Sequence, residues 1–370
     1  MSKQAVVILI ILFALAVLAE AGPYTEAGVN GYIGDDWRHA DPEDEDAVIN
    51  PIFRGWATGF EDYFPSDDDL TESHGIYDLN DPYKALGPVV GWVYDVVSLG
   101  DLDEYEIADG CSPGQITLLF GNPSVPNDPN HIRNVSGYDF VVFENAFLST
   151  YTGGGAIAGE MFAELGYVEV SSDGVNFARF PSVSLTAGLV GAYGTIEVSD
   201  IFNLVGKHPN AGGICTGTPF DLSEITGDAN VVSGIVDINN ISYVRIVDIP
   251  GSGDFYDKSV EHIDPASGPD WNYYDASQPI YDAWVTSNPG GVDLEAIGVL
   301  YSQEYAEDIN LDGIVDYDDL MILSGAWLKQ FGQDGWVARC DLAEPKDYII
   351  NMLDYAVFAS QWRCKETWRD

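Results

Sequence analysis

Basic side chains are scarce in this sequence. Its 370 residues contain 15 lysines and arginines against 60 aspartates and glutamates, which gives a formal net charge of −45. Recognition of nucleic acids or anionic membranes needs clustered positive charge, so this composition excludes both. An acidic surface instead favours bound cations and keeps a protein soluble. General adaptation to salty surroundings is an alternative origin of the same charge.

Catalytic signatures are also absent from the sequence. It contains no G-x-S-x-G motif, no H-E-x-x-H motif and no glycine-rich phosphate loop. His262 lies beside Glu261 and Asp264, and we interpret it as a loop residue rather than as a metal or acid–base site. The histidines are scattered without metal-ligand spacing, at His39, His74, His131, His208 and His262. Glycoside hydrolysis needs only two carboxylates at a set separation, so the sequence leaves that activity open.

Cysteine is rare, with four residues in the chain and no C-x-x-C pair. Metal ligation by thiolates is therefore the weaker interpretation. In an exported protein, four cysteines can form two disulfides. Three connectivities are open in principle, and the one that keeps each bridge within a domain pairs Cys340 with Cys364 and Cys111 with Cys215.

One long apolar run stands at the N-terminus, from Ala5 to Ala19. It ends in the A-x-A cleavage pattern Ala19-Glu20-Ala21 and is shorter than the ~20 residues that span a bilayer. We therefore predict a signal peptide over residues 1–21 and a mature chain that is secreted, extracellular or bound at the cell surface. An uncleaved membrane anchor is the alternative.

Helical periodicity is missing between about Pro23 and Ser302. Short β-rich runs alternate there with clusters of Gly, Pro, Asn and Asp, which is typical of strands joined by turns. The clearest runs are Tyr138–Phe143, Tyr167–Val170, Tyr243–Val247 and Ala296–Leu300. Asp173-Gly174 is a strong hairpin signal because both residues tolerate positive φ. We predict a mainly β fold with a β-sandwich domain, of jelly-roll type, over residues 22–303.

The sequence after Tyr301 changes in composition and repeats itself. A shift of 35 residues superposes like residues, among them Asp312 on Asp347, Asp316 on Asn351, Asp319 on Asp354 and Trp327 on Trp362. This indicates an internal duplication. We predict a linker over residues 304–306 and a small α-helical domain over residues 307–370. Its first helix is expected over residues 318–329, and its two helices are expected to pack together and bury Trp327 and Trp362.

Residues 308–319 match the EF-hand calcium loop at each ligand position. Side-chain oxygens fall at the first, third, fifth and ninth places, and Asp319 closes the loop. Gly313 stands where the backbone turns sharply, and the next residue supplies a backbone carbonyl. Calcium takes six to eight oxygen ligands, which suits this set better than the tight octahedron of magnesium. The predicted calcium ligands are Asp308, Asn310, Asp312, Ile314, Asp316 and Asp319.

The second copy of the loop departs from this pattern. Asp341 to Asp354 spans 14 residues instead of 12, and Tyr348 takes the place of the turn glycine. Its weaker ligand set is Asp341, Asp347, Asn351 and Asp354, and Glu344 is an additional candidate. We predict one strong calcium site in the first loop and leave the second open, with a Cys340–Cys364 bridge as another means of holding its shape.

The two loop–helix repeats, from Glu307 to about Arg363, resemble type I dockerins. Asp rather than Glu at the end of the loop, on Asp319, is part of that resemblance. Dockerins attach secreted polysaccharide-degrading enzymes to cohesin-bearing scaffolds, so the resemblance implies calcium binding and such a partner. Tyr317 and Asp318 stand where dockerins typically carry small hydroxyl residues for cohesin recognition. The partner is therefore either a cohesin-like scaffold or another surface of this chain.

Three stretches of the larger domain resemble galactose-binding-like, discoidin-type β-sandwiches. They are Tyr167–Phe177, Tyr243–Ile246 and Asp293–Val299. A further segment, Val142–Phe147, is similar to one in uncharacterised exported bacterial cell-surface proteins. The first resemblance implies a carbohydrate- or surface-binding module. Aromatic side chains in loop-like sequence can either stack on sugar rings or simply pack, namely Trp271, Tyr273, Tyr274 and Trp284.

Three acidic residues of the larger domain are candidates for a structural calcium site, Glu144, Asp293 and Glu295, with plain surface positions as the alternative. Taken together, the sequence predicts a calcium-binding, dockerin-like protein with a non-catalytic β-sandwich that binds carbohydrate or a surface. Its expected setting is extracellular polysaccharide breakdown. A secreted polysaccharide-degrading O-glycosyl hydrolase and a structural cell-surface protein are the alternative functions.

Overall fold

The computed structural model describes residues 24–35, 38–66, 78–257, 262–263, 273–274, 277–286, 290–331 and 333–369. The predicted signal peptide, His74, Glu261, Asp264 and Trp271 lie outside these residues. Within these ranges, none of the helices combines the length and hydropathy that a membrane span requires.

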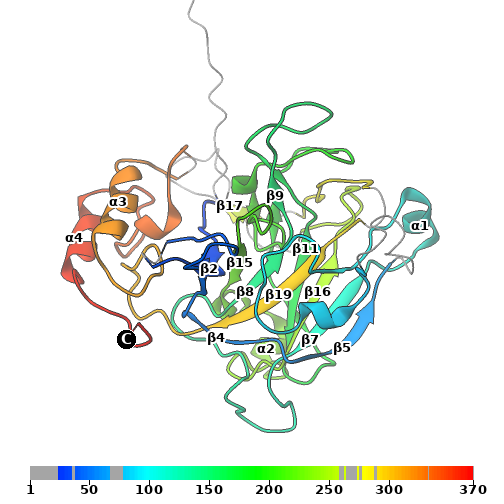
Figure 1. The fold of residues 1–370 in the computed structure, drawn as a ribbon, viewed down its shortest axis with the longest axis horizontal. Coiled ribbons are helices and arrows are strands. Elements are labelled where there is room, and N and C mark those ends of the chain that lie inside the picture. The colour runs from blue at the N-terminus through cyan, green and yellow to red at the C-terminus, as the bar shows by residue number, and fades with distance from the viewer. Residues whose placement is uncertain are drawn as a thin grey trace, which may run out of the picture.

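Two antiparallel sheets form the body of the molecule, which is mainly β as predicted (Figure 1). The first sheet has the order β1 (Val29–Asn30), β15 (Thr216–Phe220), β8 (Phe140–Glu144), β19 (Asp293–Leu300) and β4 (Phe53–Trp56), and β6 (Val97–Ser98) also pairs with β19. The second sheet has the order β12 (Ala178–Arg179), β11 (Gly166–Ser171), β16 (Tyr243–Asp248), β7 (Gln115–Leu119) and β5 (Gly59–Phe64).

Shorter elements decorate these sheets. Four two-stranded ribbons pair β2 (Tyr32–Ile33) with β3 (Val48–Ile49), β9 (Phe147–Leu148) with β10 (Met161–Phe162), β13 (Val183–Ser184) with β14 (Ile201–Phe202), and β17 (His262–Ile263) with β18 (Tyr273–Tyr274). The α-helices are α1 (Glu104–Asp109), α2 (Ala229–Val232), α3 (Tyr317–Gly325) and α4 (Met352–Ser360). The 3₁₀ turns are η1 (Pro82–Ala85), η2 (Val198–Asp200), η3 (Leu222–Ile225) and η5 (Ala338–Cys340).

The two large sheets share one buried core, as a β-sandwich requires. Phe140 and Val142 of β8 contact this core, and Val168 of β11 and Ile246 of β16 reach it from the other sheet. The alternate residues of β8 pack in a second apolar cluster on the opposite side. Strand β8 is therefore buried on both faces, which explains why its sequence is a continuous apolar run rather than an alternating one.

The hairpin predicted at Asp173-Gly174 is confirmed. It joins β11 to β12, which pair in antiparallel register. Gly174 has a φ of +75°, in the left-handed region that glycine tolerates best. Asp173 Oδ1 accepts from the backbone N–H groups of Val175 (2.9 Å) and Asn176 (2.8 Å), which closes the turn.

Neither predicted disulfide is present, because all four cysteines carry free thiols. Cys111 is exposed just after α1, whereas Cys215 packs in the second apolar cluster beside Phe143, so the two thiols occupy different environments. Cys340 is buried in the C-terminal core, and Cys364 contacts the side-chain oxygen of Gln361 at 3.2 Å instead. Packing in the cores, not covalent bridging, accounts for Cys215 and Cys340.

The C-terminal segment forms a separate apolar cluster around α3 and α4, beside the sheets and next to β2 (Figure 1). Helix α3 ends at Gly325, earlier than predicted, because Leu328 turns into the left-handed region with a φ of +61°. The predicted burial of Trp327 and Trp362 is wrong, since Trp327 is half-buried and Trp362 is 41% exposed. The buried aromatic side chains of this cluster are Phe331, Trp336 and Phe358.

Candidate metal centre

The two acidic loops of the C-terminal segment are joined by matching backbone hydrogen bonds. The residue after the turn of each loop pairs with the residues that follow the helix of the other repeat. The bonds run from Val315 N to Cys364 O (3.0 Å), Arg363 N to Val315 O (2.8 Å), Ile350 N to Lys329 O (3.0 Å) and Leu328 N to Ile350 O (2.8 Å). A shift of 35 residues converts each bond into its counterpart, so the duplication in the sequence is a reciprocal pairing in space.

The loop-closing aspartates hold the two loops in the same way. Asp319 Oδ1 accepts from the N–H groups of Ile309 (2.7 Å) and Asn310 (3.0 Å), while Oδ2 accepts from that of Asp316 (2.8 Å). In the second repeat Asp354 accepts the equivalent bonds, from Leu342 N (2.7 Å), Ala343 N (2.9 Å) and Asn351 N (2.8 Å). Each aspartate also belongs to a capping box that begins its helix, α3 or α4.

The first loop turns its carboxylates inward onto its own backbone. Asp308 accepts from Asp312 N through Oδ1 (3.1 Å) and from Gly313 N through Oδ2 (2.8 Å). Burial, followed by the charge of Asp319, raises the pKa of Asp308 to about 7. Burial likewise raises the pKa of Asp319 to about 6. Asp308 and Asp319 are close enough for their charges to repel, but among the described residues the first loop does not bring three carboxylate oxygens within 4.8 Å of one another, as the second loop does.

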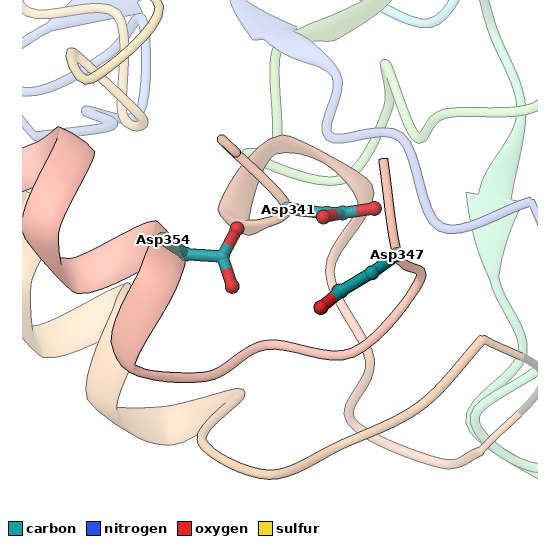
Figure 2. Close-up of side chains that lie close together, drawn as sticks. All are labelled: Asp341, Asp347 and Asp354. Carbon is teal, nitrogen blue, oxygen red and sulfur yellow. The ribbon is translucent and has the colours of Figure 1, made fainter. Parts of the chain in front are cut away.

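The second loop gathers three carboxylates. One oxygen from each of Asp341, Asp347 and Asp354 lies within 4.8 Å of the others, and Figure 2 shows the three side chains around a common space. Asp341 and Asp354 are buried and Asp347 is exposed. Asp341 Oδ1 has no hydrogen-bond partner, and burial raises the pKa of this carboxyl to about 6. These three residues could hold a metal ion, and an oxygen-only set is the kind that calcium prefers.

The other predicted residues of the second loop take different roles. Asn351 caps α4 through Oδ1 and donates its Nδ2–H to Asp347 Oδ2 at 2.9 Å, so it orients a member of the group. Glu344 is exposed and forms an ion pair with Lys346 at 3.7 Å. Tyr348 makes the turn with a φ of +58°, in place of the glycine of the first loop. Sequence spacing could not show that a tyrosine would adopt this conformation.

The first loop also contacts the sandwich. Leu311 is 5% exposed and packs in the second apolar cluster with Val29, Ile52 and Phe53. The neighbouring Asn310 and Asp312 line a small cleft with residues 28–30 of the sandwich. An expected calcium loop is therefore part of the contact between the two parts of the chain.

The outer surface of α3 and α4 carries a shallow apolar groove. Its lining comes from both repeats, namely Leu320, Leu323, Ser324, Trp327, Met352 and Tyr355. Tyr355 is the residue that the duplication places opposite Leu320. Half-buried Trp327 lies in this groove rather than in the core between the helices.

The three acidic candidates of the sandwich differ from one another. Glu295 is tied to protein groups on both oxygens, with Oε1 accepting from Val90 N (2.8 Å) and Gly91 N (2.6 Å) and Oε2 from the amide of Asn210 (2.6 Å). It therefore joins strand β19 to two neighbouring segments. Glu144 and Asp293 each keep one buried oxygen without a hydrogen-bond partner.

The aromatic residues considered for sugar stacking and the histidines considered for metal or acid–base roles do not form a site among the described residues. Trp284 is half-buried and donates its Nε1–H to Leu102 O at 2.9 Å, so it packs against the sandwich. His262 and the pair Tyr273 and Tyr274 lie in the ribbon β17–β18, and their side chains fall outside the described part of the structure. His208 is half-buried and bonded to Thr218 Oγ1 (3.1 Å) and Glu26 O (3.0 Å), which marks it as structural.

Comparisons of the chain with protein-family models, with curated proteins and with solved structures found no match.

Proposed function

We propose that this chain is an exported calcium-binding protein in which a dockerin-like module, residues 307–370, links a non-catalytic β-sandwich to an extracellular partner. The observation that carries this proposal is the reciprocal pairing of two loop–helix repeats, one of which brings Asp341, Asp347 and Asp354 to within ion-binding distance. The sandwich is proposed to bind carbohydrate or a surface during extracellular polysaccharide breakdown.

Calcium would act on this module through the helix ends. The closing carboxylates of Asp319 and Asp354 accept backbone N–H bonds from their loops and complete the capping boxes that begin α3 and α4. An ion bound by these same carboxylates would fix the loop and the start of the helix together. The relative orientation of α3 and α4, and hence the shape of the apolar groove, would then depend on calcium.

The apolar groove on α3 and α4 is the proposed docking surface. Its lining combines Leu320 and Trp327 from the first repeat with Met352 and Tyr355 from the second. A cohesin-like scaffold is the partner that the loop–helix repeats suggest. The contact of Leu311 with the sandwich uses a different part of the module, so both contacts can exist at once.

Support for carbohydrate binding comes from exposed aromatic side chains on the sandwich. Trp92 is 48% exposed and packs edge-on against Tyr94, with ring centroids 5.8 Å apart. An indole held by a second ring offers a flat apolar surface of the kind that stacks on sugar rings.

Two measurements test the proposed function. Immobilised cohesin domains should retain the full-length protein in calcium and release it in chelator, and a Trp327→Ala variant should be retained less. The protein should also be retained by at least one member of a polysaccharide panel, with Trp92→Ala as the variant and Tyr105→Ala, another exposed aromatic, as the control. Failure on both counts would remove the proposal, and release of reducing sugar would replace the non-catalytic function with glycoside hydrolysis.

A further inference from the structure

Six acidic side chains at one end of the sandwich, outside both C-terminal loops, lie close enough for their charges to act on one another. They come from the ends of β8, β16 and β19, from the segments just before β11 and just after β6, and from residues 277–286. We name them the sandwich carboxylate cluster, which consists of Asp101, Glu144, Glu164, Asp248, Asp282 and Asp293.

Backbone geometry at Gly291 brings these segments together. Gly291 N donates to Glu164 Oε1 (3.0 Å), and the next residue, Val292, donates its N–H to Asp248 Oδ1 (2.8 Å). Gly291 has a φ of +76°, and a Cβ atom there would lie 2.5 Å from Gly100 O and 2.6 Å from Asp248 Oδ1. No larger residue fits, so the glycine allows three distant segments to approach one another closely.

Several oxygens of this cluster are buried without a hydrogen-bond partner. Glu144 is 2% exposed and Asp248 is fully buried, yet Glu144 Oε1 and Asp248 Oδ2 accept no hydrogen bond. The same holds for Asp293 Oδ1 and Asp101 Oδ1. Buried polar atoms are nearly always satisfied, so four such oxygens at one place indicate a missing partner.

The fold compensates buried acids elsewhere. Glu169 is buried in the second sheet, and its two oxygens accept from Arg179 Nε and Arg245 Nε, each at 2.7 Å. In the described part of the chain, no member of the sandwich carboxylate cluster forms an ion pair of this kind. The ammonium group of Lys84 donates to Tyr94 O instead.

We propose that the sandwich carboxylate cluster binds a divalent cation, Ca²⁺, with Glu144, Asp248 and Asp293 as its central ligands. The donors are all oxygens, with no histidine or cysteine among them, which selects a hard cation. Among the described residues, only Asp341, Asp347 and Asp354 bring three carboxylate oxygens within 4.8 Å of one another, so members of the sandwich cluster would reach a shared ion partly through water. This site is independent of the proposed function, because none of its members lies in the C-terminal module.

The experiment counts calcium in a full-length protein whose C-terminal loops have been disabled. Asp312→Ala and Asp347→Asn remove a predicted ligand from each loop, and the metal content is then measured by mass spectrometry after gel filtration in calcium. We expect this double variant to retain one calcium per chain, and magnesium at the same concentration not to replace it. A calcium content of zero would overturn the proposal, whatever the fate of the docking function.

A second pair of variants locates the ion. Adding Glu144→Gln and Asp293→Asn to that background should abolish the remaining calcium and the calcium-dependent rise in melting temperature. Glu295→Gln is the matched control, because Glu295 is a buried carboxylate of the same strand with both oxygens engaged, and it should keep both. Equal calcium content in the two variants would overturn the assignment. Circular dichroism verifies folding, and if the first variant does not fold, Asp248→Asn replaces it with the same expected loss.

Discussion

The two C-terminal loops share one frame, the backbone hydrogen bonds accepted by Asp319 and Asp354, but their other carboxylates make different contacts. In the first, Gly313 makes the turn with a φ of +87°, and both oxygens of Asp308 accept from the loop backbone. In the second, which is two residues longer, Tyr348 makes the turn and Asp341 Oδ1 is left without a hydrogen-bond partner. A loop that matches the calcium motif therefore need not have its carboxylate oxygens free to bind an ion. Backbone N–H groups of the loop can occupy the same oxygens.

The largest expected effect is a loss of stability when either loop-closing aspartate is removed, and it tests whether the two frames contribute equally to stability. Asp354→Ala leaves three backbone N–H groups without acceptors, one of them in the capping box of α4, so we expect a loss of about 4 kcal/mol of stability in the C-terminal module. Asp319→Ala should cost a similar amount. Chemical denaturation followed by tryptophan fluorescence measures both, and a difference of more than about 2 kcal/mol between the two variants would show that the frames are unequal.

The contact between the first loop and the sandwich has no counterpart in the second loop. Leu311→Ala should cost about 2 kcal/mol, because it removes buried side-chain atoms from a cluster shared by both parts of the chain. Leu328→Ala is the matched control, since Leu328 has nearly the same φ but is 64% exposed, and it should cost little. Limited proteolysis near residues 302–307 measures the loosening, and equal cleavage of the two variants would contradict the assigned interface.

Calcium titration separates the two loops directly. If the second loop binds as its geometry suggests, Asp347→Asn should weaken one site at least tenfold while leaving the calcium-free stability nearly unchanged, because Asp347 is exposed. Asp312→Ala should abolish the site that the sequence predicts in the first loop. Isothermal titration of the two variants against the unsubstituted protein decides which site is stronger. An unchanged titration curve for Asp347→Asn would exclude the second loop as a calcium site.

The smallest expected effect is a change in the pH dependence of stability that arises in the sandwich and not in either loop. Burial, then the charge of Lys207, lowers the pKa of His208 to about 3. The unfolded chain takes up a proton below the ordinary value of about 6.5, whereas the folded chain does not, so stability falls as the pH drops from that value. We expect His208→Gln to reduce this loss by about 1 kcal/mol between pH 6.5 and 5.5. Identical pH dependence in the two proteins would contradict a histidine that stays neutral in the folded chain.

The sequence was most informative where structure is local or repeated. The run Tyr138–Phe143 and the turn at Asp173-Gly174 predicted a β-strand and a hairpin that the structure contains. The sequence named Glu144 and Asp293 as candidates for a structural calcium site, but local patterns could not reveal the rest of the sandwich carboxylate cluster, because its members are scattered from Asp101 to Asp293 and meet only through tertiary folding. The exposure of Trp362 was missed for a related reason. An apolar stripe on a helix does not show whether its outer edge faces a core or solvent.

The packing of Leu311 against the sandwich couples two equilibria of the first loop, namely ion binding and contact with the sandwich. Leu311 lies between two predicted calcium ligands, and its side chain is buried only while the two parts of the chain are in contact. An ion that stabilises this loop conformation therefore strengthens the contact with the sandwich. The contact strengthens ion binding by the same free energy, because the coupling between two equilibria is reciprocal. Calcium bound in this loop would then also determine how rigidly the sandwich is attached to the C-terminal module.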